Sequence, residues 1–300
     1  MKTAFDVIII GGSFAGLSAA MSLGRAMRNV LVIDGGEPCN APTPHSHNFI
    51  THDGSKPFEI LKKAKQQVLE YPSVQFVTGI ATSAQKSDNV FHISLKSGAT
   101  FSARKLLFAT GIKDIMPEVS GFSDCWGVSV LHCPYCHGYE VRNEKTGIVA
   151  NGDTAFDLAR LIQHWTRELT LFTNGKPTLS QLQVEKLTSA GVTIEERFIQ
   201  KLEHDNGYIN RVQLADGSQV PIKAIYTRPA FVQHCDIPIL LGCETNEQKL
   251  LKVDMLQKTS VDGVYAAGDN SSPARSIAVA VAAGAMAGGA INRALIEESF

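Results

Sequence analysis

The sequence predicts an α/β protein in which one strand–helix–strand domain is inserted into another. Short apolar runs that end in small or acidic residues flank a stretch with helical apolar spacing, and this order occurs twice. The first copy covers residues 5–10, 14–27 and 29–33, and the second covers residues 146–150, 155–165 and 169–172. A chain of 300 residues is also too long for one ordinary hydrophobic core and suits two domains.

Each strand–helix–strand pattern is followed by a stretch in which apolar and polar residues alternate around turn signals, at 73–110 and 192–226. Alternation of this kind predicts a small antiparallel meander. One more apolar run precedes a C-terminal helix rich in alanine and glycine. Assigned to the first domain, this run makes that domain discontinuous, with residues 1–115 and 231–300 on either side of an inserted domain of residues 116–230. We therefore expect two three-layer, Rossmann-like domains, each with a small antiparallel β insert.

Composition excludes several classes of protein. Lys and Arg together number 28 and Asp and Glu number 29, so no surplus of positive charge is present for binding nucleic acid. Hydrophobic residues make up 44% of the chain, which excludes global disorder. Asp6 and the glycine pair after it do not fit a signal peptide, and the apolar run 277–291 is shorter than the ~20 residues that span a bilayer. We expect a cytoplasmic protein that binds neither nucleic acid nor a membrane.

The first candidate site is the segment between the first predicted strand and the first predicted helix. It comprises Gly11, Gly12, Ser13, Phe14, Ala15 and Gly16. A dinucleotide pyrophosphate needs close approach of the backbone and the positive end of a helix. The segment matches the pattern G-x-G-x-x-G except that Ser13 replaces the middle glycine, and Asp34 at the end of the next strand suits a ribose hydroxyl. A tight turn that binds no ligand is the alternative.

The second candidate site is the CxxC segment Cys133-Pro134-Tyr135-Cys136, which predicts a redox-active dithiol. The two intervening residues let the sulfur atoms close a small ring. His137 follows directly and can exchange protons near neutral pH. A zinc site and an inert disulfide are the alternatives, although zinc usually takes ligands from a second such pair and the other cysteines are scattered.

The third candidate site is Gly268-Asp269, at the end of the last predicted strand. Its carboxylate suits the ribityl chain of a flavin, and a helix that starts near Ser276 would stabilise negative charge on the reduced flavin ring. An N-cap or turn aspartate is the alternative.

Together, the segments GGSFAGLSAA, ATG (109–111), CPYCHGYE (133–140) and VYAAGD (264–269) resemble the low-molecular-weight thioredoxin reductase family over nearly the whole chain. The resemblance implies an FAD-bound homodimer in which Cys136 lies nearest the flavin and Cys133 exchanges with the partner. Besides the first loop, Asp34 and Asp269, it implies FAD contacts from Gly35, His47, Asn48, Ala81, Thr110, Gly111, Gly268 and Ala278.

Three departures from the family pattern bear on proton transfer and on NADPH. His137 stands where the family usually has an aspartate that donates a proton. Ala150 replaces the first glycine of the second nucleotide loop, whereas Ala155 is acceptable at its last position. The stretch 172–176 has neither an arginine for a 2′-phosphate nor an acid for a 2′-hydroxyl. We expect the inserted domain to keep the shape of a nucleotide-binding domain without standard use of NADPH.

The loop after Asp34 carries His45 and His47. With CPYCHGYE, this His-x-His segment is similar to FAD dithiol oxidases of the gliotoxin-oxidase type, which close disulfides in small natural products. Loop histidines that cap backbone groups are the alternative. The remaining cysteines are expected to be buried small hydrophobes rather than a second redox relay: Cys39, Cys125, Cys235 and Cys243.

The sequence therefore predicts an FAD-dependent dithiol/disulfide oxidoreductase that passes electrons between FAD and the Cys133–Cys136 pair. The expected partner is a thioredoxin-like protein or a small dithiol or disulfide. A ferredoxin or another flavoprotein would supply electrons in the reductase direction, and oxygen would remove them in the oxidase direction. An ordinary NADPH-dependent thioredoxin-disulfide reductase is the first alternative, and a non-catalytic flavin-binding redox sensor is an alternative of another class.

Overall fold

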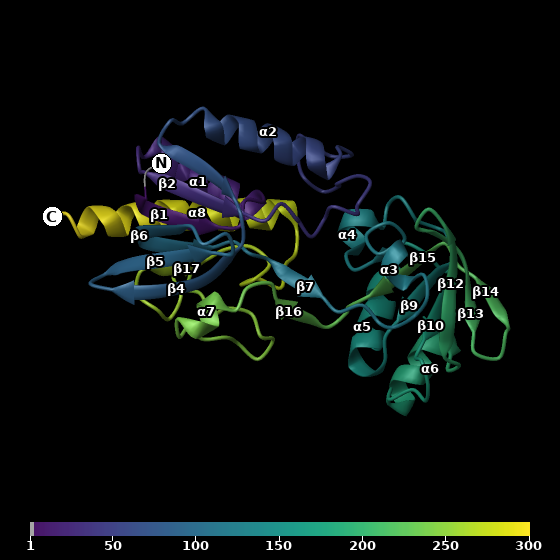
Figure 1. The fold of residues 1–300 in the computed structure, drawn as a ribbon. Coiled ribbons are helices and arrows are strands. Elements are labelled where there is room, and N and C mark those ends of the chain that lie inside the picture. Colours follow the sequence, from purple (N-terminus) through teal and green to yellow (C-terminus); the bar gives the residue numbers. More distant parts are fainter. Residues whose placement is uncertain (1–2) are drawn as a thin grey trace. The chain divides into compact units, whose positions relative to one another are not determined.

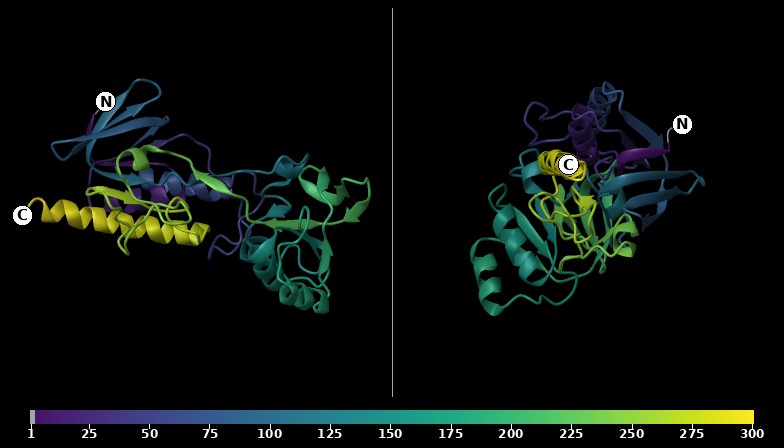
Figure 2. Two further views of the ribbon diagram at one scale, coloured as in Figure 1. Left: turned by 90° about the horizontal axis from the view of Figure 1, so that it is seen from below. Right: turned by 90° about the vertical axis from the view of Figure 1, so that its left-hand side faces the viewer.

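A computed structural model describes residues 3–300, and its contacts divide the chain into two compact units (Figures 1 and 2). Unit 1 contains the described residues up to Ala41 together with Pro57–Lys113 and Phe231–Phe300, and unit 2 contains Pro42–Lys56 and Asp114–Ala230. The chain thus passes between units after Ala41, Lys56, Lys113 and Ala230. The sequence placed Pro42–Lys56 in the first domain, whereas its contacts in the structure assign it to unit 2.

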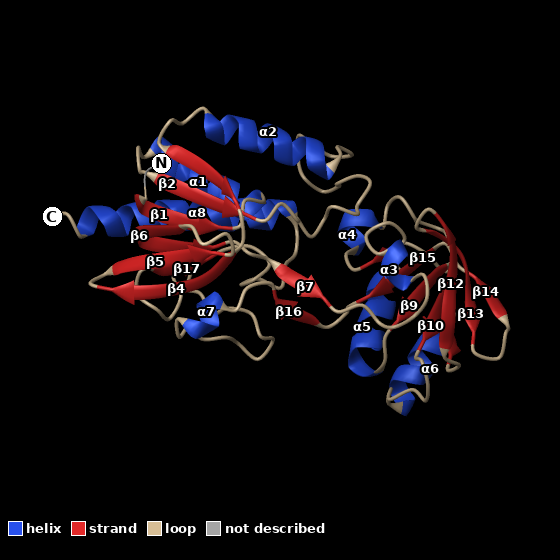
Figure 3. Ribbon diagram, viewed as in Figure 1, coloured by secondary structure: helices blue, strands red, loops and turns tan. Residues whose placement is uncertain are grey.

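Unit 1 is built on a sheet with the order β3-β2-β1-β6-β5-β4, in which β17 also pairs with β6 (Figure 3). The strands are β1 (Ala4–Ile10), β2 (Val30–Asp34), β3 (Val74–Thr78), β4 (Ala81–Ser87), β5 (Val90–Leu95), β6 (Thr100–Phe108) and β17 (Val264–Ala266). The helices are α1 (Phe14–Arg25), α2 (Pro57–Leu69), α7 (Ile237–Leu240) and α8 (Ile277–Glu297). A separate pair, β7 (Ile112–Asp114) with β16 (Phe231–Gln233), lies next to the points, after Lys113 and Ala230, where the chain changes unit.

The apolar run of β1 supplies both faces of this sheet. Val7 and Ile9 are fully buried in the cluster that also holds side chains of α1 and α8. Ile8 and Ile10 point to the opposite face, where they pack in a cluster that includes Ile237 of α7. Because successive strand residues point to opposite faces, a strand covered on both sides must be apolar throughout. This requirement accounts for the uninterrupted run that predicted the strand.

Helix α8 packs closely on α1. A Cβ added to Gly284 would lie 2.1 Å from the Ala15 carbonyl oxygen, and one on Gly288 would lie 2.9 Å from the Ala19 carbonyl oxygen. At 21 residues, α8 is longer than the apolar run seen in the sequence, and by length and composition it could cross a membrane. In unit 1 the face of α8 that holds Gly284 and Gly288 is part of the core, and 33% of the most apolar stretch of the helix is buried.

Unit 2 has a five-stranded parallel sheet with the order β11-β10-β9-β15-β8 and a separate antiparallel sheet of β12, β13 and β14. The strands are β8 (Val130–Leu131), β9 (Thr146–Val149), β10 (Leu169–Phe172), β11 (Thr193–Glu195), β12 (Ile199–Asp205), β13 (Tyr208–Leu214), β14 (Gln219–Pro221) and β15 (Ala224–Thr227). The helices are α3 (Phe122–Cys125), α4 (Pro134–His137), α5 (Gly152–Ile162) and α6 (Gln181–Ser189).

The predicted α/β fold class is confirmed, but the two expected meanders are shorter than the sequence suggested. β3 pairs in parallel with β2, and β11 pairs in parallel with β10, so the first strand of each stretch belongs to a parallel sheet. The last strands, β6 and β15, also pair in parallel with β1 and β9. Antiparallel pairing is left to β4, β5 and the first half of β6 in unit 1, and to β12–β14 in unit 2.

The close approach of α8 to α1 predicts that Gly284→Ala destabilises the protein. The new methyl group meets the Ala15 backbone, which cannot move aside without shifting α1, so we expect a loss of about 1–3 kcal/mol in the free energy of unfolding. Gly289→Ala on the same helix is the matched control, because a Cβ there meets nothing within 4 Å. Urea unfolding of both variants measures the difference, and equal stability of the two would contradict the close packing.

Candidate functional site

The loop between β1 and α1 is shaped by contacts that only glycine allows. Gly11 has φ +107°, and a Cβ there would lie 2.2 Å from the Ala109 carbonyl oxygen. A Cβ on Gly16 would lie 1.9 Å from the Gly11 carbonyl oxygen. The backbone of the loop therefore runs directly against both the start of α1 and the end of β6, as a loop that cradles a pyrophosphate must.

The start of α1 is open to an anion. Ser13 is the N-cap residue, but its side chain makes no capping hydrogen bond, and the first turn holds no acidic residue. The amide groups and the positive end of the helix are therefore available to a phosphate. Asp34, at the end of β2, accepts a hydrogen bond from the Gly12 amide on Oδ1 at 2.9 Å, which fixes its carboxylate beside the loop for a ribose hydroxyl.

The segment after β17 lies against the same loop. A Cβ on Gly268, which has φ +94°, would lie 3.1 Å from Cβ of Ala15 in the first turn of α1. Asp269 follows, and its Oδ2 lies 3.5 Å from Nε of Arg275 and 3.8 Å from Sγ of Cys39. The sequence did not single out Arg275, and it singled out Cys39 only as an expected buried hydrophobe. Arg275 follows Asp269 closely in the chain, whereas Cys39 approaches it from a distant position that no local motif predicts.

Asn270 is a second residue that the motifs did not include. It is fully buried, and its Nδ2 donates hydrogen bonds to the Phe108 carbonyl oxygen at 2.8 Å and to Thr110 Oγ1 at 3.4 Å. Its Oδ1 is also buried and has no hydrogen-bond partner among the described residues. A buried amide oxygen normally accepts a hydrogen bond, so this atom marks a place where a polar ligand fits. In the sequence, its position directly after Gly268-Asp269 was the one sign that Asn270 belongs to this site.

The remaining predicted FAD contacts divide between the units. Gly35, Ala81, Thr110, Gly111 and Ala278 belong to unit 1, with Ala278 in the first turn of α8. His47 and Asn48 belong to the segment that the structure assigns to unit 2. The glycine loop, the held carboxylate of Asp34 and the open amide oxygen of Asn270 together fit the pyrophosphate and ribose of FAD. The contacts of individual residues with FAD stay predictions.

Unit 2 carries the redox-active pair, and the structure joins Cys133 to Cys136 in a disulfide with a Cα–Cα distance of 5.3 Å. Cys133 is the N-cap residue of α4, and Pro134 begins that helix. The disulfide uses the sulfur atoms that a zinc ion would need. A Cβ on Gly138 would lie 2.8 Å from Nε1 of Trp165, so this tryptophan packs directly behind the CxxC turn.

His137 lies beside the disulfide in a cluster of titratable side chains. Burial lowers the pKa of His137, the negative charge of Glu140 opposes this shift, and His47 deepens it. The imidazole of His137 is therefore neutral at pH values where an ordinary histidine is partly charged, and it can accept a thiol proton. His47 itself lies 3.6 Å from Asp53 through Nδ1 and 3.6 Å from Glu140 through Nε2.

The other cysteines differ from one another in burial. Burial raises the pKa of the Cys125 thiol to about 11, and it also raises the pKa values of Cys235 and Cys243. Such thiols stay protonated and unreactive at neutral pH. Cys125 and Cys243 are buried as expected, whereas Cys235 is half-buried. Cys39 is exposed, so the expectation of burial was wrong for this residue. It lies in the turn that follows β2, where the backbone runs over the surface.

The second nucleotide loop, between β9 and α5, is closed by its own side chain. Asn151 is the N-cap residue of α5, and its Oδ1 accepts hydrogen bonds from the Gly152 amide at 2.9 Å and from the Thr178 amide at 2.8 Å. Its Nδ2 donates to the carbonyl oxygens of Thr173 at 3.3 Å and Lys176 at 3.1 Å. The loop after β10 is thereby bound to the start of α5.

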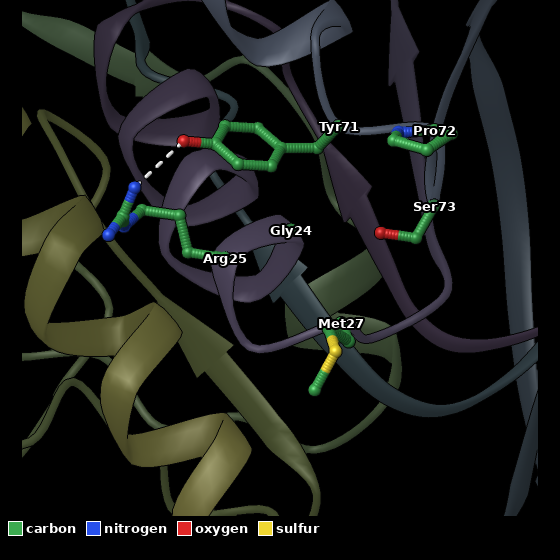
Figure 4. Close-up of a pocket in the computed structure, with 6 residues that line it drawn as sticks. All are labelled: Gly24, Arg25, Met27, Tyr71, Pro72 and Ser73. Atoms are coloured by element: carbon green, nitrogen blue, oxygen red, sulfur yellow. Dashed lines mark hydrogen bonds between the residues drawn. The ribbon is translucent and has the colours of Figure 1, made fainter.

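A further hollow in unit 1 lies at the opposite end of α1 from the glycine loop (Figure 4). It has a volume of about 380 Å³ and is lined by Gly24, Arg25, Met27, Tyr71, Pro72 and Ser73. Arg25 Nη1 donates a hydrogen bond to Tyr71 Oη at 3.1 Å across it. None of the predicted site residues lines this hollow, and it is not part of the candidate site.

Comparison with known proteins gives a consistent result. Residues 5–287 match the family described as pyridine nucleotide-disulphide oxidoreductase. The chain is 31% identical to thioredoxin reductase sirT of Leptosphaeria maculans over 96% of its own length and 93% of the relative's. It is 28% identical to a thioredoxin reductase of Treponema pallidum over 96% of each chain. Among solved structures, an oxidoreductase from Agrobacterium tumefaciens has a TM-score of 0.92 at 38% identity and covers 99% of both chains.

These matches confirm the expected thioredoxin reductase-like fold and the expected enzyme class. The family uses FAD, in agreement with the fit of the residues in unit 1. The glycine loop, the CxxC disulfide and the match over residues 5–287 lead to one conclusion: the chain is an FAD-dependent oxidoreductase of the pyridine nucleotide-disulphide oxidoreductase family, similar to thioredoxin reductases.

Proposed function

We propose that this enzyme oxidises dithiols: a substrate dithiol reduces the Cys133–Cys136 disulfide, and oxygen is the final electron acceptor, without NADPH as a standard reductant. The substrate is a small dithiol or the dithiol of a thioredoxin-like protein. An ordinary NADPH-dependent thioredoxin reductase is the second candidate, and the names of the relatives favour it. A sensor without turnover is disfavoured by the CxxC disulfide with a histidine base beside it.

The observation that carries the proposal is the contrast between the two helix starts. In unit 1 the Ser13 side chain leaves the start of α1 open, whereas in unit 2 the Asn151 side chain caps the start of α5. A pyrophosphate at the second loop would compete with Asn151 for the Gly152 amide. The nucleotide would also have to separate the loop after β10 from α5, at the cost of the bonds to Thr173, Lys176 and Thr178.

The chemistry of the residues is consistent with thiol oxidation. A substrate thiol gives its proton to neutral His137, and the resulting thiolate attacks Sγ of Cys133 and displaces Cys136 as a thiolate. The second substrate thiolate then attacks the mixed disulfide, so that the substrate disulfide forms and Cys133 is released. The substrate loses two electrons and the cysteine pair gains them. FAD, when bound, supplies a two-electron acceptor for the reduced pair, and oxygen takes the electrons from there.

Exposed aromatic side chains flank the disulfide on the surface of unit 2. Tyr135 is 64% exposed and its ring is held edge-on to Trp165 at 5.5 Å, and Tyr139 is 67% exposed with the Arg142 guanidinium 3.9 Å from its ring centre. Large exposed aromatics with fixed positions are typical of binding surfaces. They support a substrate that presents apolar or aromatic groups next to its thiols.

The closed second loop and the lack of arginine at residues 172–176 predict that NADPH is a poor reductant. Two missing arginine contacts, each worth about 1.5–3 kcal/mol, weaken binding by a factor on the order of a hundred or more. In an anaerobic titration of the purified enzyme, dithiothreitol should bleach the flavin absorbance and micromolar NADPH should not. Rapid bleaching by micromolar NADPH would restore the ordinary reductase as the better assignment.

Asn151→Gly tests the closed loop directly. With the capping side chain removed, we expect tighter NADPH binding than in the wild type, measured by fluorescence titration. Asn206→Gly is the matched control, since Asn206 lies in the turn between β12 and β13 and has no bond to the nucleotide loop. If Asn151→Gly binds NADPH no better than Asn206→Gly does, Asn151 is not what closes the site.

The roles of the two cysteines follow from the proposed exchange at Cys133. Incubated with a small disulfide such as glutathione disulfide, Cys136→Ser should trap a mixed disulfide, because the Cys133 thiolate displaces one thiolate from the disulfide and no second cysteine is present to release the other. Cys133→Ser should trap none. Mass spectrometry of the intact protein detects the adduct. Both variants should also carry Cys39→Ser, because that exposed cysteine could form adducts of its own. An adduct found only in the Cys133→Ser protein would reverse the roles.

A further inference from the structure

The loop that carries His47 is closed on itself and holds the ring in place. The Ser46 amide donates to the Ser55 carbonyl oxygen at 2.8 Å, and the Gly54 amide donates to the Ser46 carbonyl oxygen at 2.9 Å. The Asn48 amide donates to Oδ1 of Asp53 at 2.8 Å, so this carboxylate is fixed by the loop as well. Because these bonds flank His47 on both sides, its position is largely set before any substrate binds.

The His47 ring lies between two carboxylates from different segments. Oδ1 of Asp53, in the same loop, is 3.6 Å from Nδ1, and Oε1 of Glu140, just after α4, is 3.6 Å from Nε2. A proton on either ring nitrogen therefore faces a carboxylate. The His47 side chain is 21% exposed, Glu140 is 40% exposed and Asp53 is 70% exposed, so the cluster leads from a largely covered imidazole toward solvent.

His137 is linked to this cluster through charge. Glu140 acts on both histidines, since it contacts His47 and raises the pKa of His137, while the charge of His47 lowers the pKa of His137. Glu140 and His47 are the titratable groups that act on His137 among the described residues. The titratable groups that face His47 are Asp53, Glu140 and His137.

We propose that His47, held between Asp53 and Glu140, is a positioning residue for proton transfer at the Cys133–Cys136 pair: it keeps His137 ready to accept the thiol proton, and the negative charge of Glu140 stabilises His137 once it carries that proton. The inference rests on the proposed dithiol chemistry. His137 stands where the thioredoxin reductase pattern has a single aspartate, and the Asp53–His47–Glu140 cluster sets the charge around it.

The proton of the first thiol moves through His137, and the proton of the second thiol passes to the Cys133 thiolate as that thiolate is released. The S–H bond of the incoming thiol breaks as its proton moves to His137, and the thiolate breaks the Cys133–Cys136 bond, so the disulfide is the oxidant. The new imidazolium of His137 is repelled by a charged His47 and attracted by Glu140. The repulsion favours return of the proton, to the Cys136 thiolate or to water, once the substrate disulfide has formed.

Three variants should shift the titration of His137 upward, downward and not at all. The titration of His137 is followed by the ring-proton NMR signals of histidine-labelled oxidised protein, and the pH profile of dithiothreitol oxidation is measured in parallel. His47→Gln removes the opposing charge, so His137 should titrate at higher pH and the acid limb of the profile should move to higher pH. Glu140→Gln removes the attracting charge and should move both in the opposite direction. His52→Gln, in the same loop but stacked on Phe49, should leave both unchanged.

The double variant His47→Gln/Glu140→Gln separates coupling from local disruption. Because the two residues contact each other, their effects on His137 should not add. Opposite shifts with non-additive combination support the proposal. Unchanged titration of His137 in both single variants, or shifts of the same sign, would overturn it. A wild-type protein that fails to oxidise dithiothreitol at any pH would overturn the proposed function instead, and the NMR titration would still decide the role of His47.

Discussion

Contact between bare backbones around α1 is the constraint on which unit 1 depends. On one side, Gly16 brings the helix against the Gly11 carbonyl group, and on the other side Gly284 brings α8 against Ala15. No side chain separates these elements, so the start of α1 has one position relative to the sheet. Gly268 lies against the same turn, which places Asp269 and Asn270 beside the phosphate loop. Packing of the C-terminal helix and formation of the cofactor site are therefore one structural requirement.

The same architecture serves a different purpose in unit 2. The amide groups at a helix start must be satisfied by a side chain, by water or by a ligand. At the start of α5 the Asn151 side chain satisfies the Gly152 amide, and the helix that it caps leads to Trp165, which packs behind the CxxC turn at Gly138. A domain of the nucleotide-binding type thus becomes a rigid support for the disulfide. The charged groups around His137 include His47, which comes from the segment Pro42–Lys56, far away in the sequence.

Local patterns in the sequence were sufficient to identify the strand–helix–strand units, the glycine loop, Asp34 and the CxxC pair. Each of these features is defined by residues that are close in the chain. β3 and β11 were assigned to meanders because a short half-buried strand looks the same whether its partner is parallel or antiparallel. Segment Pro42–Lys56 was assigned to the wrong unit because chain order, not contact, guided the division. The bonds of Asn151 and His47 join loops that are distant in the sequence, so only the structure reveals them.

The uncapped start of α1 links the stability of this enzyme to the supply of its cofactor. The amide groups at the start of a helix need a hydrogen-bond partner, and a bound ligand can provide it. A ligand that binds only the folded state adds stability that grows with its concentration. Newly made chains in flavin-poor cells would therefore spend more time unfolded and be degraded faster, so riboflavin status would set the amount of this protein as well as its activity.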